Sequence, residues 1–463
     1  MNQNKMGTKK IRSLIRSMGL PMILSMVLQA LYNVVDTMFV INMGAEGAQG
    51  NLALSAAFPV QIMMIAIGVG TGVGINALLS KNLGEGKKED VNRVAGNGLF
   101  LAAVFFLLFF LFGAFAAEPY MKLMASDPTV IAMGTEYLRI CCCLSIGSIG
   151  YAIAERFLMA TGKTLHSMIA QLTGALINIL LDYVFIYPLG MGIAGAAYAT
   201  VIGQIASLLV ALILHYTVNR EINGHPRYIK PNMRIIGQIY TIGLPAFLMQ
   251  AMLSLMMFGM LLIIGTIKDA YTVDLLSGGY GIYYKLMQMA LFASFGLSNT
   301  LISITSFNDG MGDQARVRDT IRYGIRASVL VSLILTVFFQ LLAEPISTLF
   351  ALTVEESAIL SRSDIVSVCC IALHIATLGY VFMGFTVAIQ GILQGFREVY
   401  APLILSALRL ILFVLPIAYL FTLSSRVTTL IWWTFPIAEV LTALVAYLLL
   451  RRSLRRRDRG IGA

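Results

Sequence analysis

Twelve long apolar segments, separated by short polar ones, limit this chain to a membrane-spanning fold. A hydrocarbon core about 30 Å thick needs about 20 apolar residues to be crossed by a helix. Within such a segment, only a helix pairs all of its own backbone polar groups. The composition agrees, because 58% of the residues are hydrophobic and only 12% are charged. The predicted spans are residues 14–42, 52–80, 94–117, 129–154, 164–188, 192–218, 235–267, 275–306, 321–343, 357–392, 399–423 and 427–450.

The basic residues test this set of spans, because cytoplasmic loops of membrane proteins are enriched in Lys and Arg. If both termini are cytoplasmic, 26 of the 33 Lys and Arg residues fall on the inner side and four on the outer side. A missed or an extra span would destroy this asymmetry. We therefore expect an all-α protein with twelve transmembrane helices, in the cell (plasma or inner) membrane, with both termini in the cytoplasm. No aromatic-basic motif accompanies the net charge of +10, so we expect no nucleic-acid partner.

The second half of the chain repeats the first. Six helices per repeat give both halves the same orientation, which predicts two six-helix bundles related by a pseudo-twofold axis along the membrane normal. The predicted parts are an N-terminal lobe (1–218), a cytoplasmic linker (219–232), a C-terminal lobe (233–450) and a basic cytoplasmic tail (451–463). Four motifs recur at offsets of 224 to 228 residues: Gly19-Leu20-Pro21 and Gly243-Leu244-Pro245, Asn82 to Gly86 and Asn308 to Gly312, Glu118-Pro119 and Glu344-Pro345, and Cys141-Cys142 and Cys369-Cys370.

Two aspartates stand out within predicted spans, where an Asp costs roughly 2.5–3.5 kcal/mol and usually faces a cavity or a partner. Asp36 and Asp182 each precede the predicted outer end of their span by six residues, so we expect them at similar depth. Neighbouring carboxylates repel each other in a low dielectric, and this pattern suits a proton or sodium site. Helical spacing extends each acid into a polar stripe: Ser25, Gln29, Tyr32, Asn33 and Asp36 on the first span, and Gln171, Asn178 and Asp182 on the fifth.

The C-terminal lobe does not repeat these acids. At the repeat offset, Asp36 corresponds to Met260, and Asp182 corresponds to a position near Pro416. The eighth span instead carries Lys285, with Gln288 three residues later, and this lysine either lines a cavity or extends toward the headgroups. We interpret Arg409 and Glu439 as structural, and the five cysteines as small packing residues. Pro21 and Pro245 can bend the first and seventh spans where neighbours satisfy the freed backbone groups.

The chain lacks the motifs that identify other classes of membrane protein. Gly162-Lys163-Thr164 resembles the end of a P-loop, but Phe157 takes the place of its first glycine, so ATP-driven transport is not encoded. The loop after the second span lacks the basic Gly-Asp-Arg motif that is usual in major-facilitator carriers. No serine, cysteine or metal constellation indicates an enzyme.

Five stretches together resemble the multidrug and toxic compound extrusion (MATE) family, and they are spread over most of the chain. The two-lobe layout agrees with this resemblance. The stretches are Leu20 to Ser25 with Tyr32 to Thr37, Ala57-Phe58-Pro59, Asn178 to Asp182, Pro188 to Ala197, and Tyr280 to Lys285 followed by Phe295-Gly296-Leu297.

The resemblance implies a secondary transporter that exports organic cationic or amphipathic compounds in exchange for Na⁺ or H⁺. It implies that Asp36, Asn178 and Asp182 form the cation site, with Na⁺ as the only expected metal and no other cofactor. Gln250 stands where some members carry an acid, which leaves the coupling ion open. We expect the lipid bilayer and the transported compounds as partners, and no obligate protein partner. The side chains assigned to a substrate cavity are Gln29, Tyr32, Asn33, Gln171, Gln250, Tyr284, Lys285 and Gln288.

Two alternatives stay open. A flippase for lipids or lipid-linked oligosaccharides of related architecture predicts a basic cavity for anionic head groups, which Lys285 and Arg409 permit. A receptor or scaffold in the membrane predicts no transport, and it gives no reason for two acids at one depth. The acids of the N-terminal lobe favour the cation-coupled exporter.

Overall fold

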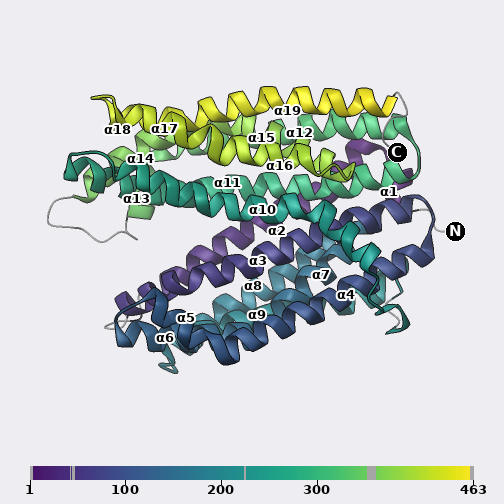
Figure 1. Cartoon of the computed structure of the whole chain (residues 1–463), viewed down its shortest axis with the longest axis horizontal. Coiled ribbons are helices and arrows are strands. Elements are labelled where there is room, and N and C mark those ends of the chain that lie inside the picture. Colours follow the sequence, from purple (N-terminus) through teal and green to yellow (C-terminus); the bar gives the residue numbers. More distant parts are fainter. Residues whose placement is uncertain (1–3, 42, 44–46, 224–225, 352–360, 459–463) are drawn as a thin grey trace. The chain divides into compact units, whose positions relative to one another are not determined.

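The computed structural model describes residues 4–41, 43, 47–223, 226–351 and 361–458 (Figure 1). These residues are almost entirely helical and contain no β-strand. Eleven of the described helices are long and apolar enough to span a membrane, and α6 with α7, bent by 43° at a short break, make a twelfth when counted as one. The predicted all-α membrane fold is therefore confirmed.

Contacts divide the chain into two compact units, which are described separately. Unit 1 comprises Met1–Phe247 and Ser303–Gln314, and unit 2 comprises Leu248–Ile302 and Ala315–Ala463. The division falls inside two helices, α10 (Met233–Ile264) and α11 (Ala270–Gly310), and not in the linker 219–232. The lobe boundaries drawn from the repeat remain a prediction.

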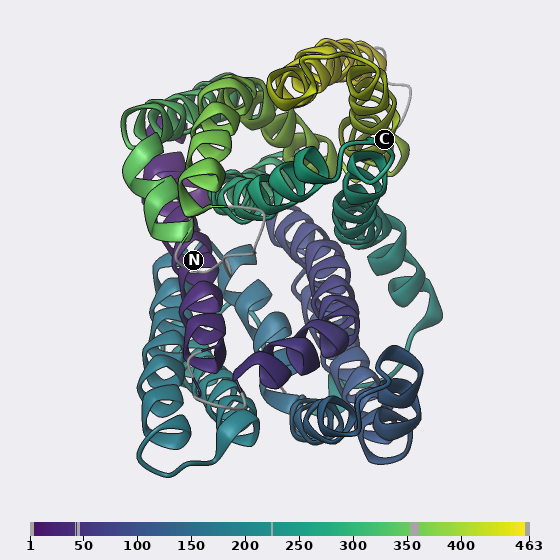
Figure 2. The same cartoon turned by 90° about the vertical axis from the view of Figure 1, so that its left-hand side faces the viewer.

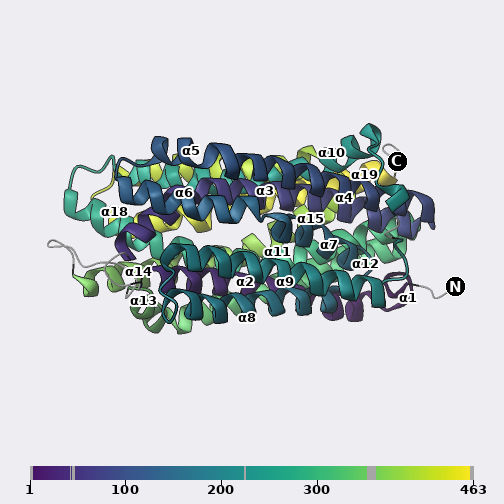
Figure 3. The same cartoon turned by 90° about the horizontal axis from the view of Figure 1, so that it is seen from below.

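Unit 1 is built around α8, which packs against α2 and α9. These three helices lie side by side in Figures 1 and 3. The first part of α10 and the end of α11 belong to this unit. Its other elements are α1 (Lys5–Thr8), α2 (Ile11–Ile41), α3 (Gly47–Gly84), α4 (Lys88–Leu111), the π-helical turn η2 (Phe112–Ala116), α5 (Ala117–Met124), α6 (Pro128–Cys143), α7 (Ile146–Ala160), α8 (Thr164–Ile186), α9 (Gly192–Val218) and η3 (Pro226–Tyr228).

Unit 2 holds the rest of α10 and α11, and its last long helix, α19, packs against α15 and α17. Figure 2 views most of the helices nearly end on, with α19 in yellow. The other elements are α12 (Gln314–Leu341), α13 (Ala343–Ala351), α14 (Arg362–Ala376), η4 (Thr377–Gly379), α15 (Tyr380–Gly395), α16 (Tyr400–Ala407), the π-helical turn η5 (Leu408–Leu412), α17 (Val414–Thr422), α18 (Val427–Leu430), η6 (Ile431–Trp433) and α19 (Thr434–Asp458).

The repeated motifs Asn82 to Gly86 and Asn308 to Gly312 form the same structure. Each ends a long helix, α3 or α11, with a glycine in the left-handed region, at φ 73° for Gly86 and 74° for Gly312. In each, the next residue donates a backbone hydrogen bond to the asparagine carbonyl, over 2.9 Å from Lys87 and 3.2 Å from Asp313. This is the Schellman cap, which favours glycine because a Cβ is strained at positive φ.

The breaks within spans differ from the sequence prediction. Residues 129–154 were predicted as one continuous span, but α6 ends at Cys143 and α7 begins at Ile146. Gly147 and Ser148 lie at this break, and Gly/Ser pairs are a known cause of sharp kinks, so the sequence held a signal that the hydrophobic pattern did not use. The start of α6 is conventional, since Asp127 caps it by accepting backbone hydrogen bonds from Thr129 and Val130, and Pro128 occupies the first turn.

Candidate functional site

Asp182 lies in the interior of unit 1. Its side chain on α8 is fully buried, and apart from Asp36, described below, neither carboxylate oxygen has a hydrogen-bonding partner among the described residues. Asn178, one turn earlier on the same face, is also buried, and both atoms of its side-chain amide lack a described partner. Buried polar groups are nearly always paired, so this group of buried oxygens is able to accept a proton, an ion or water.

Close packing between α8 and α9 positions these groups. A methyl group added at Gly203 of α9 would lie 2.9 Å from the Cβ atom of Asn178, and one at Gly174 of α8 would overlap the hydroxyl of Ser207. Glycine at these positions lets the two helices approach to backbone distance, which holds α8 firmly on one side. Asn178 and Asp182 are therefore presented from a rigid helix.

Asp36 of α2 meets Asp182 in unit 1. The two carboxyl side chains interact directly, and Tyr32, one turn before Asp36, lies within the electrostatic range of both. Asp36 is half-buried, and its Oδ1 atom is buried without a partner among the described residues. Two carboxylates side by side in a low dielectric cannot both stay charged unless a proton or a cation lies between them.

Two neighbours of Asp36 were missed by the sequence analysis. Tyr137 and Cys141 of α6 are buried within range of the charge on Asp36, and Gln61 of α3 donates a 2.6 Å hydrogen bond to the Tyr137 hydroxyl. Gln61 and Tyr137 are 76 residues apart. No local pattern couples such distant positions, and the cysteine was interpreted as a packing residue.

The residues assigned to a substrate cavity divide between the two units. In unit 1, Gln29, Tyr32 and Gln171 are half-buried, and the side chain of Asn33 lies outside the described structure. In unit 2, Gln250 and Gln288 are half-buried, whereas Tyr284 is buried and donates a 3.3 Å hydrogen bond to the Leu253 carbonyl.

Lys285 stands out on α11 of unit 2. Its side chain is exposed, although its neighbours Tyr284 and Leu286 are buried in the unit and most of the helix is buried as well. The lysine therefore does not contribute to the core of its own unit, and it is available to a ligand or to the membrane surface.

Arg409 and Glu439, in two spans of unit 2, neutralise each other. Arg409, in the π-helical turn η5, donates a 2.6 Å hydrogen bond through Nε to Oε1 of Glu439 on α19. Both side chains are largely buried, with exposed fractions of 4% and 13%. The structural interpretation of these two residues agrees with this ion pair.

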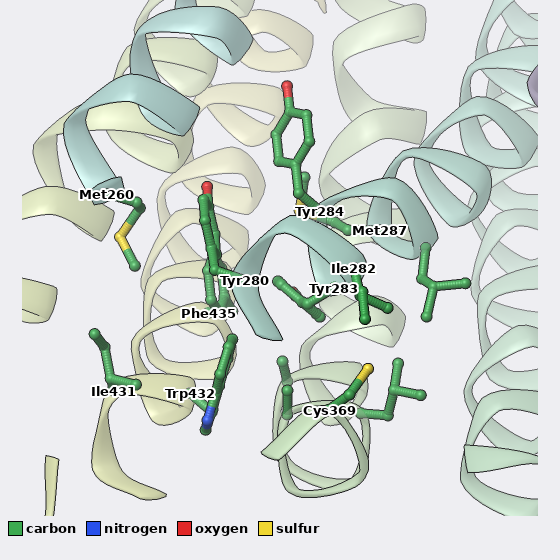
Figure 4. Close-up of a cluster of buried hydrophobic side chains, with 14 of the residues drawn as sticks. Met260, Tyr280, Ile282, Tyr283, Tyr284, Met287, Cys369, Ile431, Trp432 and Phe435 are labelled. Atoms are coloured by element: carbon green, nitrogen blue, oxygen red, sulfur yellow. The ribbon is translucent and has the colours of Figure 1, made fainter. Parts of the chain in front are cut away.

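An aromatic cluster fills the core of unit 2 close to the ion pair. Tyr283 contacts Phe435 and Trp432, with ring centroids 4.7 Å and 5.6 Å away, and Tyr280 stacks on Phe435 (Figure 4). Tyr283 also lies within range of the charge on Glu439. This cluster is densely packed apolar core, which holds α11 against α19.

No group of three or more metal-binding side chains occurs among the residues that the structure describes. Asp36, Asp182 and Asn178 offer carboxylate and amide oxygens, which are hard ligands and do not favour a transition metal.

A model of the MatE family matches residues 21–184 and again residues 245–420. The chain belongs to the MatE family. The two matched segments begin at Pro21 and Pro245, which are equivalent residues of the internal repeat. Members of the MatE family are secondary transporters, so the chain is a transporter and not an enzyme.

Curated relatives of this MatE protein include the "Multidrug export protein MepA" of Staphylococcus aureus (strain bovine RF122 / ET3-1). It is 22% identical over 431 residues, which cover 93% of this chain and 91% of the relative. The protein of the same name from Staphylococcus saprophyticus is 22% identical over 432 residues, with the same coverage.

Solved structures share the whole fold. An outward-facing multidrug resistance MATE family transporter of the MOP superfamily superposes with a TM-score of 0.90, at 24% identity and 99% coverage of both chains. A MOP superfamily transporter from Pyrococcus furiosus, described as having a binding pocket of reverse polarity that suggests a different function, gives a TM-score of 0.87 at 24% identity and 98% coverage of both chains.

Proposed function

We propose that this chain is a cation-coupled multidrug efflux antiporter, which exports organic cationic or amphipathic compounds by alternating access in exchange for Na⁺ or H⁺. The observation that carries the proposal is the Asp36–Asp182 pair, in which two carboxyl groups meet and their buried oxygens have no other partner among the described residues. The curated relatives are multidrug export proteins, which supports the same class of substrate.

The pair supplies a physical basis for coupling. Asp36 and Asp182 lie on different helices, α2 and α8, so their repulsion acts between those helices when the site is empty. A cation or proton removes this repulsion. It therefore binds more tightly when α2 holds Asp36 close to Asp182 than when α2 holds the two acids apart. Such differential affinity is what allows an ion to shift a conformational equilibrium. Pro21 within α2 and Pro245 within α10 are proposed as the points where the helices bend.

The membrane potential favours inward movement of the coupling cation and so drives the transport cycle. One net charge that crosses the membrane contributes about 2.3 kcal/mol per 100 mV, which is sufficient for more than tenfold accumulation of a substrate. For Na⁺ the amide oxygen of Asn178 adds a neutral ligand to the carboxylates, whereas a proton needs only the two acids. We assign the protein to the cell membrane, with both termini cytoplasmic and no obligate protein partner.

A drug-resistance assay in cells tests the coupling role. We expect Asp36→Asn and Asp182→Asn each to reduce resistance to that of cells without the transporter, because an amide cannot exchange the coupling ion. Asp274→Asn is a matched control, because Asp274 is an exposed acid on α11. Normal resistance with Asp36→Asn, at equal protein level, would remove the coupling role from this pair.

A further inference from the structure

The ends of α3 and α11 cross at backbone distance within unit 1. A methyl group added at Gly84 would overlap the carbonyl oxygen of Phe307, and one added at Gly310 would overlap the carbonyl oxygen of Lys81. Any side chain at either glycine would push the two helices apart. We call this contact, made by Lys81, Gly84, Phe307 and Gly310, the α3–α11 crossing.

The contact is reciprocal with respect to the internal repeat. Gly84 and Gly310 are 226 residues apart, and so are Lys81 and Phe307. Gly84 contacts Phe307, and Gly310 contacts Lys81. Since Lys81 and Phe307 are equivalent in the repeat, the two contacts are equivalent as well. This is the arrangement of an isologous interface, in which one surface pairs with its own copy. The contact joins one helix from each half of the repeat.

A buried hydrogen bond extends the contact along the two helices. The Ser303 hydroxyl of α11 donates to the side-chain carbonyl of Asn76 of α3 over 3.0 Å, and both residues are fully buried. Residues 303–310 of α11 belong to unit 1, whereas residues 270–302 belong to unit 2. The end of α11 is thus held within unit 1 by α3, a helix from the other half of the repeat.

The N-terminal helix α1 contacts Phe307 of the crossing and Met311, which directly follows α11. A methyl group at Gly7 would lie 3.0 Å from the sulfur of Met311 and 3.3 Å from the ring of Phe307. Met6, the residue before Gly7, is fully buried, and burial lowers the pKa of Lys5. Both observations show that α1 packs against the rest of unit 1.

Hydrogen bonds fix α1 in this place. The side-chain amide of Asn4 donates to the Thr161 carbonyl over 3.2 Å and to the Glu221 carboxylate over 2.7 Å. The side-chain oxygen of Asn4 also caps α1 by accepting from the backbone of Met6. The segment before the first span is therefore a folded part of unit 1 in this conformation.

We propose that the α3–α11 crossing is the latch that closes the predicted cytoplasmic end of the transporter, and that α1 is its cover. The proposal rests on alternating access, as given above for the function. The inward-facing state then requires α11 to leave Gly84 and α1 to release Met311. Because interiors tolerate added volume poorly, a single methyl group in the crossing should favour the open state.

Thiol labelling tests the latch without any substrate or gradient. Ser303→Cys reports on the crossing, and Cys142, which is 1% exposed elsewhere in unit 1, is kept as an internal reporter of unfolding. The other four cysteines are replaced by serine, and membranes opened to both sides are treated with a bulky maleimide. Gly84→Ala and Gly310→Ala are compared with Gly278→Ala, a change on α11 whose added methyl meets nothing within 4 Å.

We expect Gly84→Ala and Gly310→Ala to label at position 303 at least about tenfold faster than Gly278→Ala, with position 142 still protected. Asn4→Ala, which adds nothing to the crossing, should raise the rate about threefold because it loosens only the cover. Equal rates at position 303 in all variants would overturn the latch, and so would loss of protection at both positions. Since no transport is measured, the labelling result stands apart from success or failure of the antiport proposal.

Discussion

At the scale of single residues, two pairs of charged side chains in the protein interior differ in how their charges are balanced. Asp36 and Asp182 bring like charges together in unit 1, whereas Glu439 in unit 2 is neutralised by Arg409. Burying an unpaired charge is costly, so the second pair is complete by itself and the first requires an added cation or proton. This difference is the reason to place ion coupling in unit 1 alone.

A double-substitution cycle tests the structural role of Arg409 and Glu439. Glu439→Gln or Arg409→Met alone should destabilise the protein by about 3–5 kcal/mol, because each leaves one buried charge uncompensated. The double substitution should cost clearly less than the sum of the two. The measurement is the apparent melting temperature of the purified protein in detergent.

Asp458→Asn serves as the control for this cycle. It removes an ion pair with Arg318 whose side chains are 70% and 65% exposed, and such pairs contribute little. Additive losses from the two buried substitutions would show that Arg409 and Glu439 act independently, against the structure.

At the scale of helices, the sequence predicted where spans lie much better than where they break. Span length is imposed by the bilayer, so hydrophobicity alone finds the spans. The irregularities have local signals that hydrophobicity does not capture. Gly147 and Ser148 follow the break after Cys143, and Pro119 and Pro416 follow the π-helical turns at 112–116 and 408–412, where a proline removes one backbone donor. The Gly86 and Gly312 caps were visible as repeated motifs because their backbone requires glycine.

Two equivalent helix ends make a test at this scale. α7 and α15 end with the same backbone hydrogen bond between residues five positions apart. Lys163 donates to the carbonyl of Leu158, and Glu398 donates to the carbonyl of Leu393. The left-handed residue is Gly162 (φ 79°) in the first but Arg397 (φ 64°) in the second. A side chain in this region costs about 1–2 kcal/mol.

Gly162→Ala should therefore lower the stability by about 1 kcal/mol, and Arg397→Gly should raise it by a few tenths, after the greater chain entropy of glycine is subtracted. The three proteins are heated in detergent, and the fraction that stays monodisperse is measured at each temperature to compare their stability. A destabilised Arg397→Gly protein would mean that the arginine side chain stabilises this helix end more than its backbone strain costs.

At the scale of the whole molecule, the repeat and the acids were predictable, and their neighbourhood was not. The shared depth of Asp36 and Asp182 follows from span boundaries, and the structure brings their side chains together. Contacts such as Gln61 with Tyr137, or Ser303 with Asn76, join residues from distant helices. They depend on tertiary packing, which one sequence without its fold does not encode in any local pattern.

Transport by the purified protein in liposomes tests the central claim most directly. Efflux of an ethidium-type organic cation is measured under an imposed Na⁺ gradient and, separately, an imposed H⁺ gradient, for the unaltered chain, Asp36→Asn, Asp182→Asn and the Asp274→Asn control. We predict efflux driven by one of the two gradients, abolished by both site substitutions and retained by the control. The absence of organic-cation movement under either gradient, or gradient-driven efflux that survives Asp36→Asn and Asp182→Asn, would contradict the account, and the first outcome would favour a lipid flippase.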